Sequence, residues 1–406
     1  MPIIPNTESK EFVYDLPEDR IAQYPLADRS SSRLLVYKDG NIQEGVFNQI
    51  GEHLPSTALL VFNETRVIQA RLRFKKGTGA VIEIFCLEPH IPSDYALSLG
   101  TQEFCSWKCL VGNSKRWKSG ILTMSLIIRN MHINLHAERL ENDGESSFIK
   151  FSWDEASVSF AEILETAGEV PLPPYLNRPA EESDKGRYQT VYARQDGSVA
   201  APTAGLHFTQ GILDNLSARG VQSARLCLHV GAGTFKPVQA RLISEHEMHN
   251  EHFFVSRELV GKLLKHPGPI VAVGTTSVRT LESLYHLGRK LLMSQKSIGD
   301  FQIDQWSGME ESNYSRNECL QAILDQMEAR GSGILEASTQ IMIVPGYRFR
   351  MTDILITNFH QPGSTLLMLI AAFTGEDWKK IYAFALDHGF RFLSYGDSNL
   401  LFRTAD

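Results

Sequence analysis

The sequence predicts an α/β fold: a layered α/β main domain, discontinuous in the chain, with an inserted small all-β barrel domain. Two observations predict it. Strands alternate with helices after residue 153, as in layered domains with a mainly parallel sheet. Between residues 67 and 152, short β-rich runs separated by turns replace that alternation. We therefore expect residues 1–66 and 153–406 to form the main catalytic domain and residues 67–152 to form the barrel.

The expected barrel segment contains short runs rich in β-branched and aromatic residues. Glycine, asparagine and aspartate separate these runs, for example at residues 76–79 and 142–145. Helical periodicity is weak over this part of the chain. Strands are expected at residues 81–87, 107–111, 121–128, 132–137 and 148–151. Short strands at this spacing indicate a small barrel or sandwich.

The main domain is predicted from apolar runs that lead into loops and capped helices. Residues 59–62 form an apolar run followed by polar residues, which is typical of a buried strand that ends in a loop. Further strands are expected at residues 224–230, 269–273 and 353–359. Helices are expected after Thr209, Gly274 and Ser364, and a last amphipathic helix is expected to end at Gly389.

Residues 289–333 differ from the rest of the main domain. They are polar and irregular, apart from a helical stretch near residues 318–327. We expect this part to be a variable insertion or an excursion over the surface.

The charge balance limits how the protein could bind nucleic acid. The formal net charge is −7 and the isoelectric point is near 6.0, so the protein as a whole does not attract a polyanion. RNA binding would require a local basic patch on an acidic body. Hydrophobic residues make up 43% of the chain and charged residues 21%, so a sizeable core is available.

Cysteine usage and the start of the chain indicate a cytoplasmic protein. Five cysteines, an odd number, do not suggest a disulfide framework, so we expect free thiols in a reducing compartment. The first residues lack the basic region and apolar run of a signal peptide. The densest apolar stretch, residues 366–373, is far shorter than the ~20 residues of a membrane-spanning helix. We expect a monomer that does not associate with membranes.

Two glycine-containing regions lie where a strand is expected to meet a loop or helix, which is where open α/β sheets bind ligands. Residues 200–209 hold Thr203, Gly205 and His207. A tight turn with a capping threonine would explain this region equally well. Residues 229–235 hold His229, Gly231, Gly233 and Thr234 and suggest a loop that a ligand can approach. A bulge or hairpin remains an alternative, because the third glycine of the dinucleotide fingerprint is missing.

A third region, residues 246–251, contains two histidines three positions apart, of which His249 is the second, followed by Glu251. The spacing invites a zinc interpretation, but no matching cysteine or third histidine accompanies the pair. It also differs from the metalloprotease pattern, in which the histidines are four apart. We therefore expect no metal, and interpret His249 with Glu251 as a base with an orienting carboxylate or as a polar contact to a substrate.

A fourth region, residues 358–366, contains His360 between an expected strand and an expected helix. A helix N-terminus there would favour a carboxylate or phosphate; an ordinary cap beside a loop histidine is the alternative. Thr275 and Thr276 offer the same geometry after the strand at residues 269–273. Tyr395 and Asp397 are expected to end another strand, where Asp397 offers a carboxylate.

Basic residues gather in several places that could contact RNA. Arg33 lies in the N-terminal segment, Arg66 lies where the chain enters the barrel, and further lysines and arginines accompany Trp107 and Trp117. A basic surface with aromatic residues suits phosphate contacts and base stacking. For each cluster taken alone, a solvated charged face explains the residues at least as well.

Motifs along most of the chain resemble one family. They include Tyr14-Asp15-Leu16-Pro17-Glu18, Ser32-Arg33-Leu34-Leu35, Phe62-Asn63-Glu64-Thr65-Arg66-Val67, Gly168-Glu169-Val170-Pro171-Leu172-Pro173-Pro174-Tyr175 and Arg187-Tyr188-Gln189-Thr190-Val191-Tyr192-Ala193, followed by the regions described above. In this order they resemble the S-adenosylmethionine:tRNA ribosyltransferase-isomerase family of queuosine biosynthesis, over residues 14–400. Glu64 and Gln361 are small departures from its pattern, and residues 289–333 carry no recognisable motif.

The resemblance implies a reaction. The ribosyl group of S-adenosylmethionine is transferred and isomerised onto 7-aminomethyl-7-deazaguanine at the wobble position of tRNA. Epoxyqueuosine-tRNA forms, and adenine and methionine leave. S-adenosylmethionine is then a consumed substrate, and no cofactor is expected.

The resemblance also suggests roles for the residues. A base must remove a proton next to the sulfonium, and imidazole titrates in a suitable range. The catalytic candidates are His207, His229, His249, Glu251, His360 and Asp397, and the sequence does not choose the first base among the histidines. The candidates for substrate binding are Thr203, Gly205, Gly231, Gly233, Thr234, Thr275, Thr276 and Tyr395; those for RNA contact are Arg33, Arg66 and Arg187.

Two other functions fit parts of the sequence. A methyltransferase that uses S-adenosylmethionine on RNA would share the ligands and would produce S-adenosylhomocysteine. A non-enzymatic RNA-binding protein would need the basic surface without the histidines at the strand ends.

Overall fold

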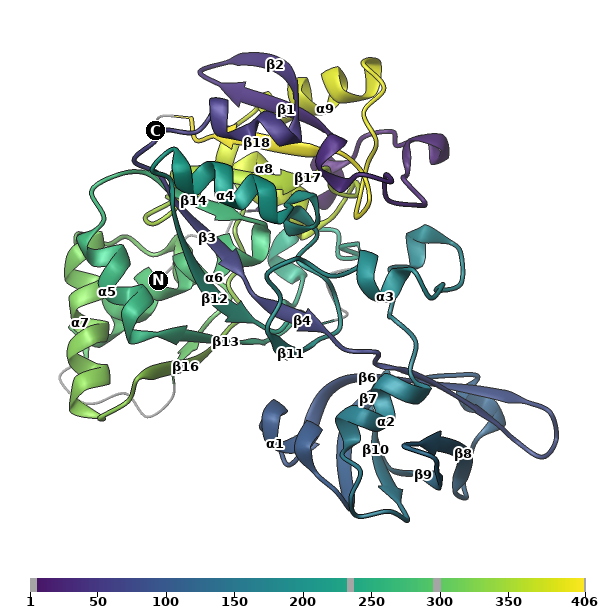
Figure 1. Ribbon diagram of the computed structural model, residues 1–406. Coiled ribbons are helices and arrows are strands. Elements are labelled where there is room, and N and C mark those ends of the chain that lie inside the picture. The colour runs from purple at the N-terminus through teal and green to yellow at the C-terminus, as the bar shows by residue number, and fades with distance from the viewer. Residues whose placement is uncertain (1–5, 232–236, 295–300, 405–406) are drawn as a thin grey trace.

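The computed structural model describes residues 6–231, 237–294 and 301–404. Its main body is a ten-stranded sheet in the order β15-β16-β13-β12-β3-β14-β17-β18-β1-β2 (Figure 1). The strands are β1 Arg33–Lys38, β2 Asn41–Val46, β3 Leu59–Asn63, β12 Gln222–Leu228, β13 Glu251–Ser256, β14 Ile270–Val273, β15 Gln302–Ile303, β16 Ile334–Thr339, β17 Ile354–Asn358 and β18 Ser398–Phe402. The predicted α/β fold is confirmed.

The sheet is parallel at its centre and antiparallel at several flanking positions. β12, β3, β14 and β17 run parallel to one another. β13 returns antiparallel to β12, and β18 returns antiparallel to β17. The starts of β13 and β18 therefore lie at the edge where the central parallel strands end.

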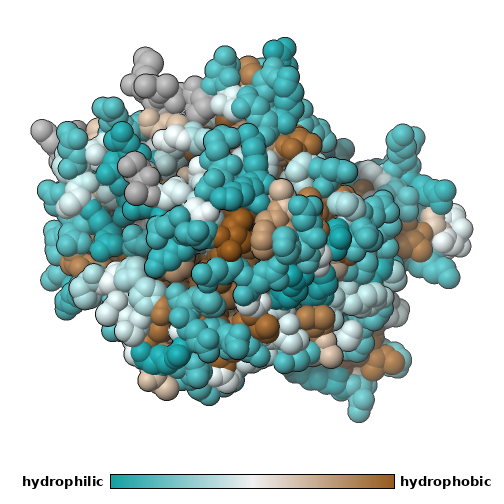
Figure 2. All heavy atoms as spheres, turned by 90° about the horizontal axis from the view of Figure 1, so that it is seen from above, coloured by the Kyte–Doolittle hydropathy of each residue, from teal (hydrophilic) through white to brown (hydrophobic). Residues whose placement is uncertain are grey.

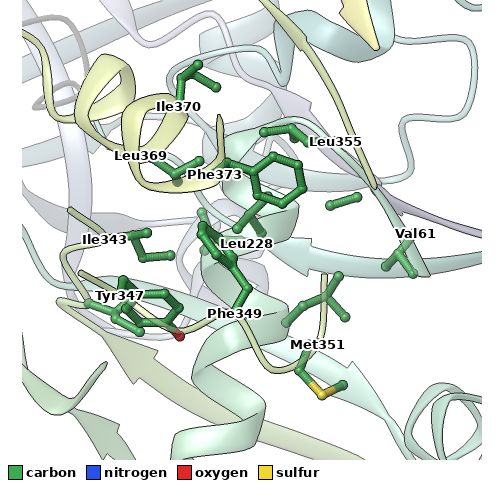
Figure 3. Packing of buried hydrophobic residues seen from close by; sticks show 14 of the residues in the cluster. Val61, Leu228, Ile343, Tyr347, Phe349, Met351, Leu355, Leu369, Ile370 and Phe373 are labelled. Atoms are coloured by element: carbon green, nitrogen blue, oxygen red, sulfur yellow. The ribbon is translucent and has the colours of Figure 1, made fainter. Parts of the chain in front are cut away.

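Helices cover both faces of this sheet, and the central strand β3 shows how. Leu59 and Val61 point into one core, shared with α5, α6, α7, α8 and α9, while Leu60 and Phe62 point into another, shared with α4. Figure 3 shows Val61 and Leu228 packed beneath residues of α8. The helices of the main body are α4 Gln210–Ala218, α5 Arg257–Lys265, α6 Thr275–Met293, α7 Arg316–Ala329, α8 Thr365–Thr374 and α9 Asp377–Asp387.

The predicted helix boundaries follow from capping. Thr209 caps α4 by accepting a hydrogen bond from the Ile212 amide, and Ser364 caps α8 through the Leu367 amide. Gly389, with φ near +73°, ends the turn after α9. These local signals placed the helices correctly because they act within a few residues.

Residues after β3 form a six-stranded antiparallel sheet in the order β5-β6-β7-β10-β9-β8. Because β5 also contacts β8, the sheet is nearly closed into a barrel. The strands are β5 Arg71–Lys75, β6 Val81–Ile91, β7 Phe104–Gly112, β8 Leu122–Ile128, β9 Met131–Asp143 and β10 Ser146–Trp153, and α1 Tyr95–Gly100 and α2 Phe160–Ala167 accompany them. The short parallel pair β4 Thr65–Val67 and β11 Gln195–Ser198 lies between this barrel and the main sheet, beside the short helix α3 Asp184–Arg187 (Figure 1).

The structure corrects three expectations. Residues 289–333 are not a surface excursion, because α6 continues to Met293 and α7 buries Cys319, Leu320 and Ile323 in the main core. Trp107 and Trp117 lie inside the barrel, so neither can stack on an RNA base. Tyr395-Gly396-Asp397 precedes β18 and does not end a strand.

The surface and the thiols agree with a folded core of ordinary composition. All five cysteines are free and buried. On the face shown in Figure 2, apolar residues form small separate patches within a mostly hydrophilic surface. Within the described ranges, the helices fall short of the length and hydrophobicity needed to cross a bilayer.

Candidate active site

A central pocket lies at the edge where the parallel strands end. It draws residues from segments that are far apart in the sequence. These are the loop before α4, the end of β12, the start of α6, the end of β17, the start of α8 and the loop before β18. The lining residues include Ala200, Thr203, Val230, Gly274, Thr275, Thr276, Thr357, Asn358, His360, Ser364, Leu366 and Ser394. The regions that the sequence singled out at strand ends therefore meet in space.

Two smaller pockets adjoin the central pocket. A basic pocket shares Ser394 with it and is lined by Arg29, Arg187, Arg391 and His207, among others. An Arg279 pocket shares Leu366 with it and is lined by Arg279, Glu251, His249 and several apolar side chains. The three pockets form a row along one edge of the sheet.

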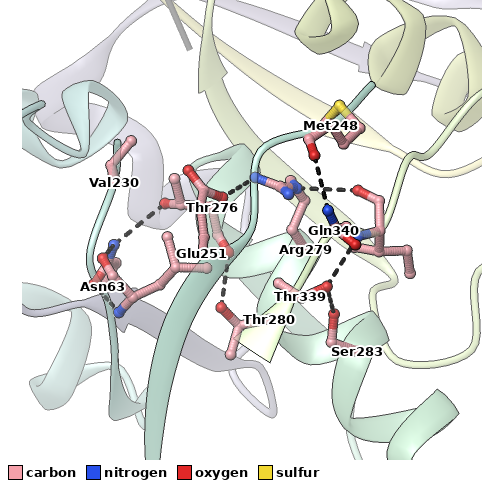
Figure 4. Close-up of polar contacts among 12 residues, drawn as sticks. Asn63, Val230, Met248, Glu251, Thr276, Arg279, Thr280, Ser283, Thr339 and Gln340 are labelled. Atoms are coloured by element: carbon pink, nitrogen blue, oxygen red, sulfur yellow. Dashed lines mark hydrogen bonds and ion pairs between the residues drawn. The ribbon is translucent and has the colours of Figure 1, made fainter. Parts of the chain in front are cut away.

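The start of α6 supplies hydroxyl groups and amides to the central pocket. Gly274 adopts φ near +90°, which a residue with a side chain rarely takes, and turns the chain from β14 into the helix. Thr275 and Thr276 follow and line the pocket. Asn63 fixes this corner, because its amide bonds the backbone of Leu228 through both of its ends and lies 3.5 Å from the Thr276 hydroxyl (Figure 4).

His360 is the candidate histidine that lines the central pocket. Its Nε2 is 2.9 Å from the Thr357 hydroxyl, and its amide donates to the Tyr382 hydroxyl at 3.0 Å. The Tyr14 hydroxyl donates to its carbonyl oxygen. Burial lowers the pKa of His360 to about 3, so the ring is neutral near pH 7 and could accept a proton, although as a weak base.

His207 lies at the wall of the basic pocket. Asn358 Nδ2 donates to its Nε2 at 3.1 Å, so the neutral ring carries its proton on Nδ1 and donates it to the Ser32 hydroxyl at 2.8 Å. Burial lowers the pKa of His207 to about 4. Because protein groups occupy both nitrogens, His207 is better placed to orient Asn358 than to exchange a proton.

His229 lies at the contact between the main body and the barrel. Its Nδ1 is 3.0 Å from the Thr65 hydroxyl, and its ring packs on Tyr95 of α1 with centroids 4.3 Å apart. Burial lowers the pKa of His229 to about 4. Gly231, two residues on, is half-buried, whereas Gly233 and Thr234 lie outside the described residues.

In the third region of the sequence, residues 246–251, one candidate side chain is exposed and the other is buried. His249 is exposed at the rim of the Arg279 pocket, whereas Glu251 is buried and pairs with Arg279 of α6. Among the described residues, no group of three or more histidine, cysteine or acidic side chains could hold a metal ion. The pairing with Arg279 explains why a carboxylate follows these histidines without invoking zinc.

Tyr395 and Asp397 have protein partners. The Tyr395 hydroxyl donates to Asp184 at 2.8 Å, and its side chain also lines the basic pocket. Asp397 is buried and accepts hydrogen bonds from the amides of Arg33 and Arg391 and from the Arg391 guanidinium. In this arrangement Asp397 fixes the loop before β18, and Arg391 reaches the basic pocket.

The first region contributes through Thr203, which lines the central pocket. Gly205 is needed for another reason. A Cβ atom there would lie 1.9 Å from the Tyr192 hydroxyl, so packing against Tyr192 requires a glycine. The structure thus places Gly205 behind the site, and the close approach that the sequence suggested is to a protein side chain.

The arginines predicted to contact RNA differ in their surroundings. Arg33 packs over the Phe390 ring and bonds Glu44 and the His388 carbonyl. Arg66 is about half exposed, with Asp196 3.7 Å away. Arg187 lines the basic pocket while bonding the carbonyl oxygens of residues 26 and 27.

Sequence reasoning missed two groups at the site. Asn358 lies in the fourth region, but the sequence analysis assigned it no function. Its contact with His207 joins residues that are far apart in the sequence, so local patterns could not predict it. Arg279 received no role either. It lies three and four positions after Thr276 and Thr275, so helical spacing would have placed all three on one face of α6.

Comparisons with known proteins identify the family of this chain. The chain matches the family described as "Queuosine biosynthesis protein" over residues 9–401. The S-adenosylmethionine:tRNA ribosyltransferase-isomerases of Pelobacter propionicus and Azoarcus sp. are 40% and 39% identical to it; the alignments cover 96% and 97% of this chain and 98% and 97% of those proteins. A crystal structure of S-adenosylmethionine tRNA ribosyltransferase from Thermotoga maritima is 29% identical, covers 96% of this chain and 99% of that one, and has a TM-score of 0.46. The chain belongs to the queuosine biosynthesis protein family.

Proposed function

We propose that this protein is an S-adenosylmethionine:tRNA ribosyltransferase-isomerase. It transfers and isomerises the ribosyl group of S-adenosylmethionine onto the aminomethyl nitrogen of 7-aminomethyl-7-deazaguanine in tRNA. The bonds from the ribosyl carbons to adenine and to sulfur break. A carbon–nitrogen bond to the tRNA base forms, a carbon–carbon bond closes the five-membered carbocycle of the product, and one proton is released. Epoxyqueuosine-tRNA, adenine and methionine are the products.

The observation that carries this proposal is the row of three pockets along one sheet edge, in a chain of this family. The central pocket brings a neutral histidine, threonine hydroxyls and helix amides to one place. The basic pocket on one side offers three arginines to the phosphates of an RNA. The Arg279 pocket on the other side is mostly apolar. The two substrates can therefore meet from opposite ends.

His360 is our candidate for the first base. It lines the central pocket, and among the described residues none bonds its Nδ1, whereas Thr357 holds Nε2. A positive sulfonium acidifies the neighbouring 5′ carbon, which lets a weak but neutral imidazole remove the proton. Glu251 and Asp397 have arginine partners and are better suited to hold charge in place than to transfer protons.

The partners follow from this assignment. S-adenosylmethionine is consumed as a substrate, so the reaction needs no bound cofactor. The tRNA must already carry the aminomethyl base, and its phosphates contact the basic pocket. We place the protein in the cytoplasm with that tRNA.

The test uses purified protein, S-adenosylmethionine and tRNA that carries 7-aminomethyl-7-deazaguanine. We expect adenine and methionine to be released in equal amounts, and only with that tRNA. Formation of S-adenosylhomocysteine would instead identify a methyltransferase. Binding of tRNA without any released adenine would favour a non-enzymatic RNA-binding protein. Either result would overturn the proposal.

A further inference from the structure

The Arg279 pocket contains a buried guanidinium group, and the described residues provide hydrogen-bond partners for only some of its nitrogen atoms. Its Nη1 pairs with Glu251, and its Nε donates to the Ile341 carbonyl oxygen at 3.2 Å (Figure 4). Its side chain is 9% exposed, and its buried Nη2 has no hydrogen-bond partner among the described residues. An unpaired buried donor of this kind is rare in folded proteins and destabilising. Arg279 and both of its bonded partners line the same pocket, so a ligand in that pocket could complete its hydrogen bonding.

The rest of the pocket is mostly apolar, with His246, His249 and Thr365 as its other polar residues. Met248, Ile341, Met342, Leu366 and Leu369 supply carbon and sulfur surface. The first turn of α8 also borders it, and helix N-terminal amides favour a negative group. The pocket therefore suits a ligand that has a carboxylate at one end of a short apolar chain.

The charged groups of the pocket determine which kind of anionic ligand it can bind. Glu251 would repel a phosphate or any other purely anionic group, because its carboxylate shares the wall with Arg279. Among the described residues, only the Oε2 oxygen of Glu251 is bonded, so Oε1 can accept from a cation. A zwitterion, with one negative and one positive group on the same carbon, complements this pair. An α-amino acid has that pattern.

We propose that this pocket holds the amino-acid end of the sulfonium substrate, with the α-carboxylate on Arg279 and the α-ammonium on Glu251. This inference rests on the proposed function. Thr275 and Arg279 are about 6 Å apart along the axis of α6, because each residue of a helix rises 1.5 Å. That distance suits the short carbon chain between the sulfur and the carboxylate. The ribosyl carbons then lie in the central pocket, and methionine is left in the Arg279 pocket after the carbon–sulfur bond breaks.

The test compares three ligands that share the nucleoside and differ at the sulfur substituent. S-adenosylmethionine carries the carboxylate and the amine, and decarboxylated S-adenosylmethionine lacks only the carboxylate. 5′-Methylthioadenosine lacks the whole amino-acid chain and, with it, the sulfonium charge, so it reports on nucleoside binding alone. Equilibrium binding to the full chain is measured with saturating tRNA that lacks the aminomethyl base, so that no reaction occurs. We expect the wild-type protein to bind S-adenosylmethionine roughly ten- to a hundred-fold more tightly than the decarboxylated ligand, as a charged hydrogen bond implies.

The variant Arg279→Met/Glu251→Gln removes both charges together, so no buried charge is left unpaired. We expect it to bind the first two ligands with affinities within a few-fold of each other and to retain the wild-type affinity for 5′-methylthioadenosine. The matched control is Arg289→Met/Glu310→Gln. Arg289 is also buried on α6, pairs with Glu310 and has an unpaired nitrogen, but it lies ten positions further along the helix. This control should discriminate between the ligands as the wild type does.

Three results would overturn the inference. The first is that Arg279→Met/Glu251→Gln still prefers S-adenosylmethionine over the decarboxylated ligand as strongly as the wild type does. The second is that the control variant loses this preference. The third is that Arg279→Met/Glu251→Gln selectively loses binding of 5′-methylthioadenosine, which would assign the pocket to the nucleoside. The proposed function fails separately, if the wild-type protein releases no adenine from S-adenosylmethionine with the modified tRNA. The two failures can therefore be told apart.

Discussion

Burial fixes the charge of the histidines at this site. His207, His229 and His360 all have a lowered pKa because little water reaches them, and each is held by a hydroxyl group. What separates them is the space beside each ring. His360 faces the central pocket, whereas His207 bonds protein groups through both nitrogens and His229 packs on the barrel. The same residue type therefore lies in three different settings, and of the three His360 is the one that we propose for proton transfer.

Replacing His360 with glutamine tests the last of these roles. We expect His360→Gln to lower kcat for tRNA-dependent adenine release by roughly 10²–10⁴-fold, the usual contribution of a general base, with little change in KM for S-adenosylmethionine. The control is His286→Gln. His286 is equally buried and has its pKa lowered to about 3, but it bonds Tyr347 within the core. A wild-type rate in the His360 variant, or an equal loss in the control, would contradict the assignment.

At the scale of elements, α6 joins the site to the core. Its first turn lines the central pocket, Arg279 lines the next pocket, and its second half packs against α7. Gly288 makes that last contact possible. A Cβ atom at this position would lie 2.2 Å from the backbone oxygen of Cys319 in α7. The close crossing of the two helices holds α6 in place and thus the residues of its first turn.

This packing predicts opposite effects for two glycines within helices. We expect Gly288→Ala to destabilise the protein by about 1–3 kcal/mol, because the helices must separate. Gly261→Ala in α5 should stabilise it by roughly 0.5–1 kcal/mol, because no described residue beyond the neighbouring backbone of α5 lies within 4 Å of the added methyl group and alanine favours a helix. Urea unfolding followed by circular dichroism measures both. Equal effects of the two substitutions would refute the packing argument.

On the scale of the whole molecule, an acidic protein concentrates basic groups around the pocket that we propose for RNA contact. The net charge is −7, yet Arg29, Arg187 and Arg391 surround one small pocket. Burial, with the neighbouring Arg187, lowers the pKa of Arg29, in keeping with crowding of positive charge. The buried histidines add a second property of the whole molecule, which is sensitivity to acid.

The sign of this effect follows from the lowered pKa values. Between pH 6.5 and about 4 the unfolded chain binds protons at these histidines and the folded chain does not, so stability falls as the pH falls through that range. We expect the free energy of unfolding to fall from pH 7 to pH 5, and His286→Gln to reduce that fall by roughly 1–2 kcal/mol. Urea titrations at both pH values and equal ionic strength measure it. An unchanged pH dependence in the variant would argue against a neutral buried His286.

Local patterns in the sequence predicted the central strands β3, β12, β14 and β17, most of the barrel strands and five helices, but they missed the flanking strands of the main sheet. Thr209, Ser364 and Gly389 marked helix ends correctly because capping acts over one turn of chain. The barrel strands followed from turns and β-rich runs, although β5 was missed, and its short run Arg71–Lys75 alternates apolar with basic residues. The division of the chain at residues 67 and 152 stays a prediction.

The sequence by itself determined the central strands, the capped helices, the strand-end regions and the family resemblance, because periodicity, caps and motifs are properties of neighbouring residues. Only the tertiary structure decided which groups share a pocket. Glu251 begins β13 and Asp397 directly precedes β18, and both reach the carboxyl edge of the parallel strands because β18 and β13 run antiparallel to β17 and β12. Strand direction depends on pairing between distant segments. The tertiary structure also shows that Arg279, to which the sequence analysis assigned no function, is the partner of Glu251.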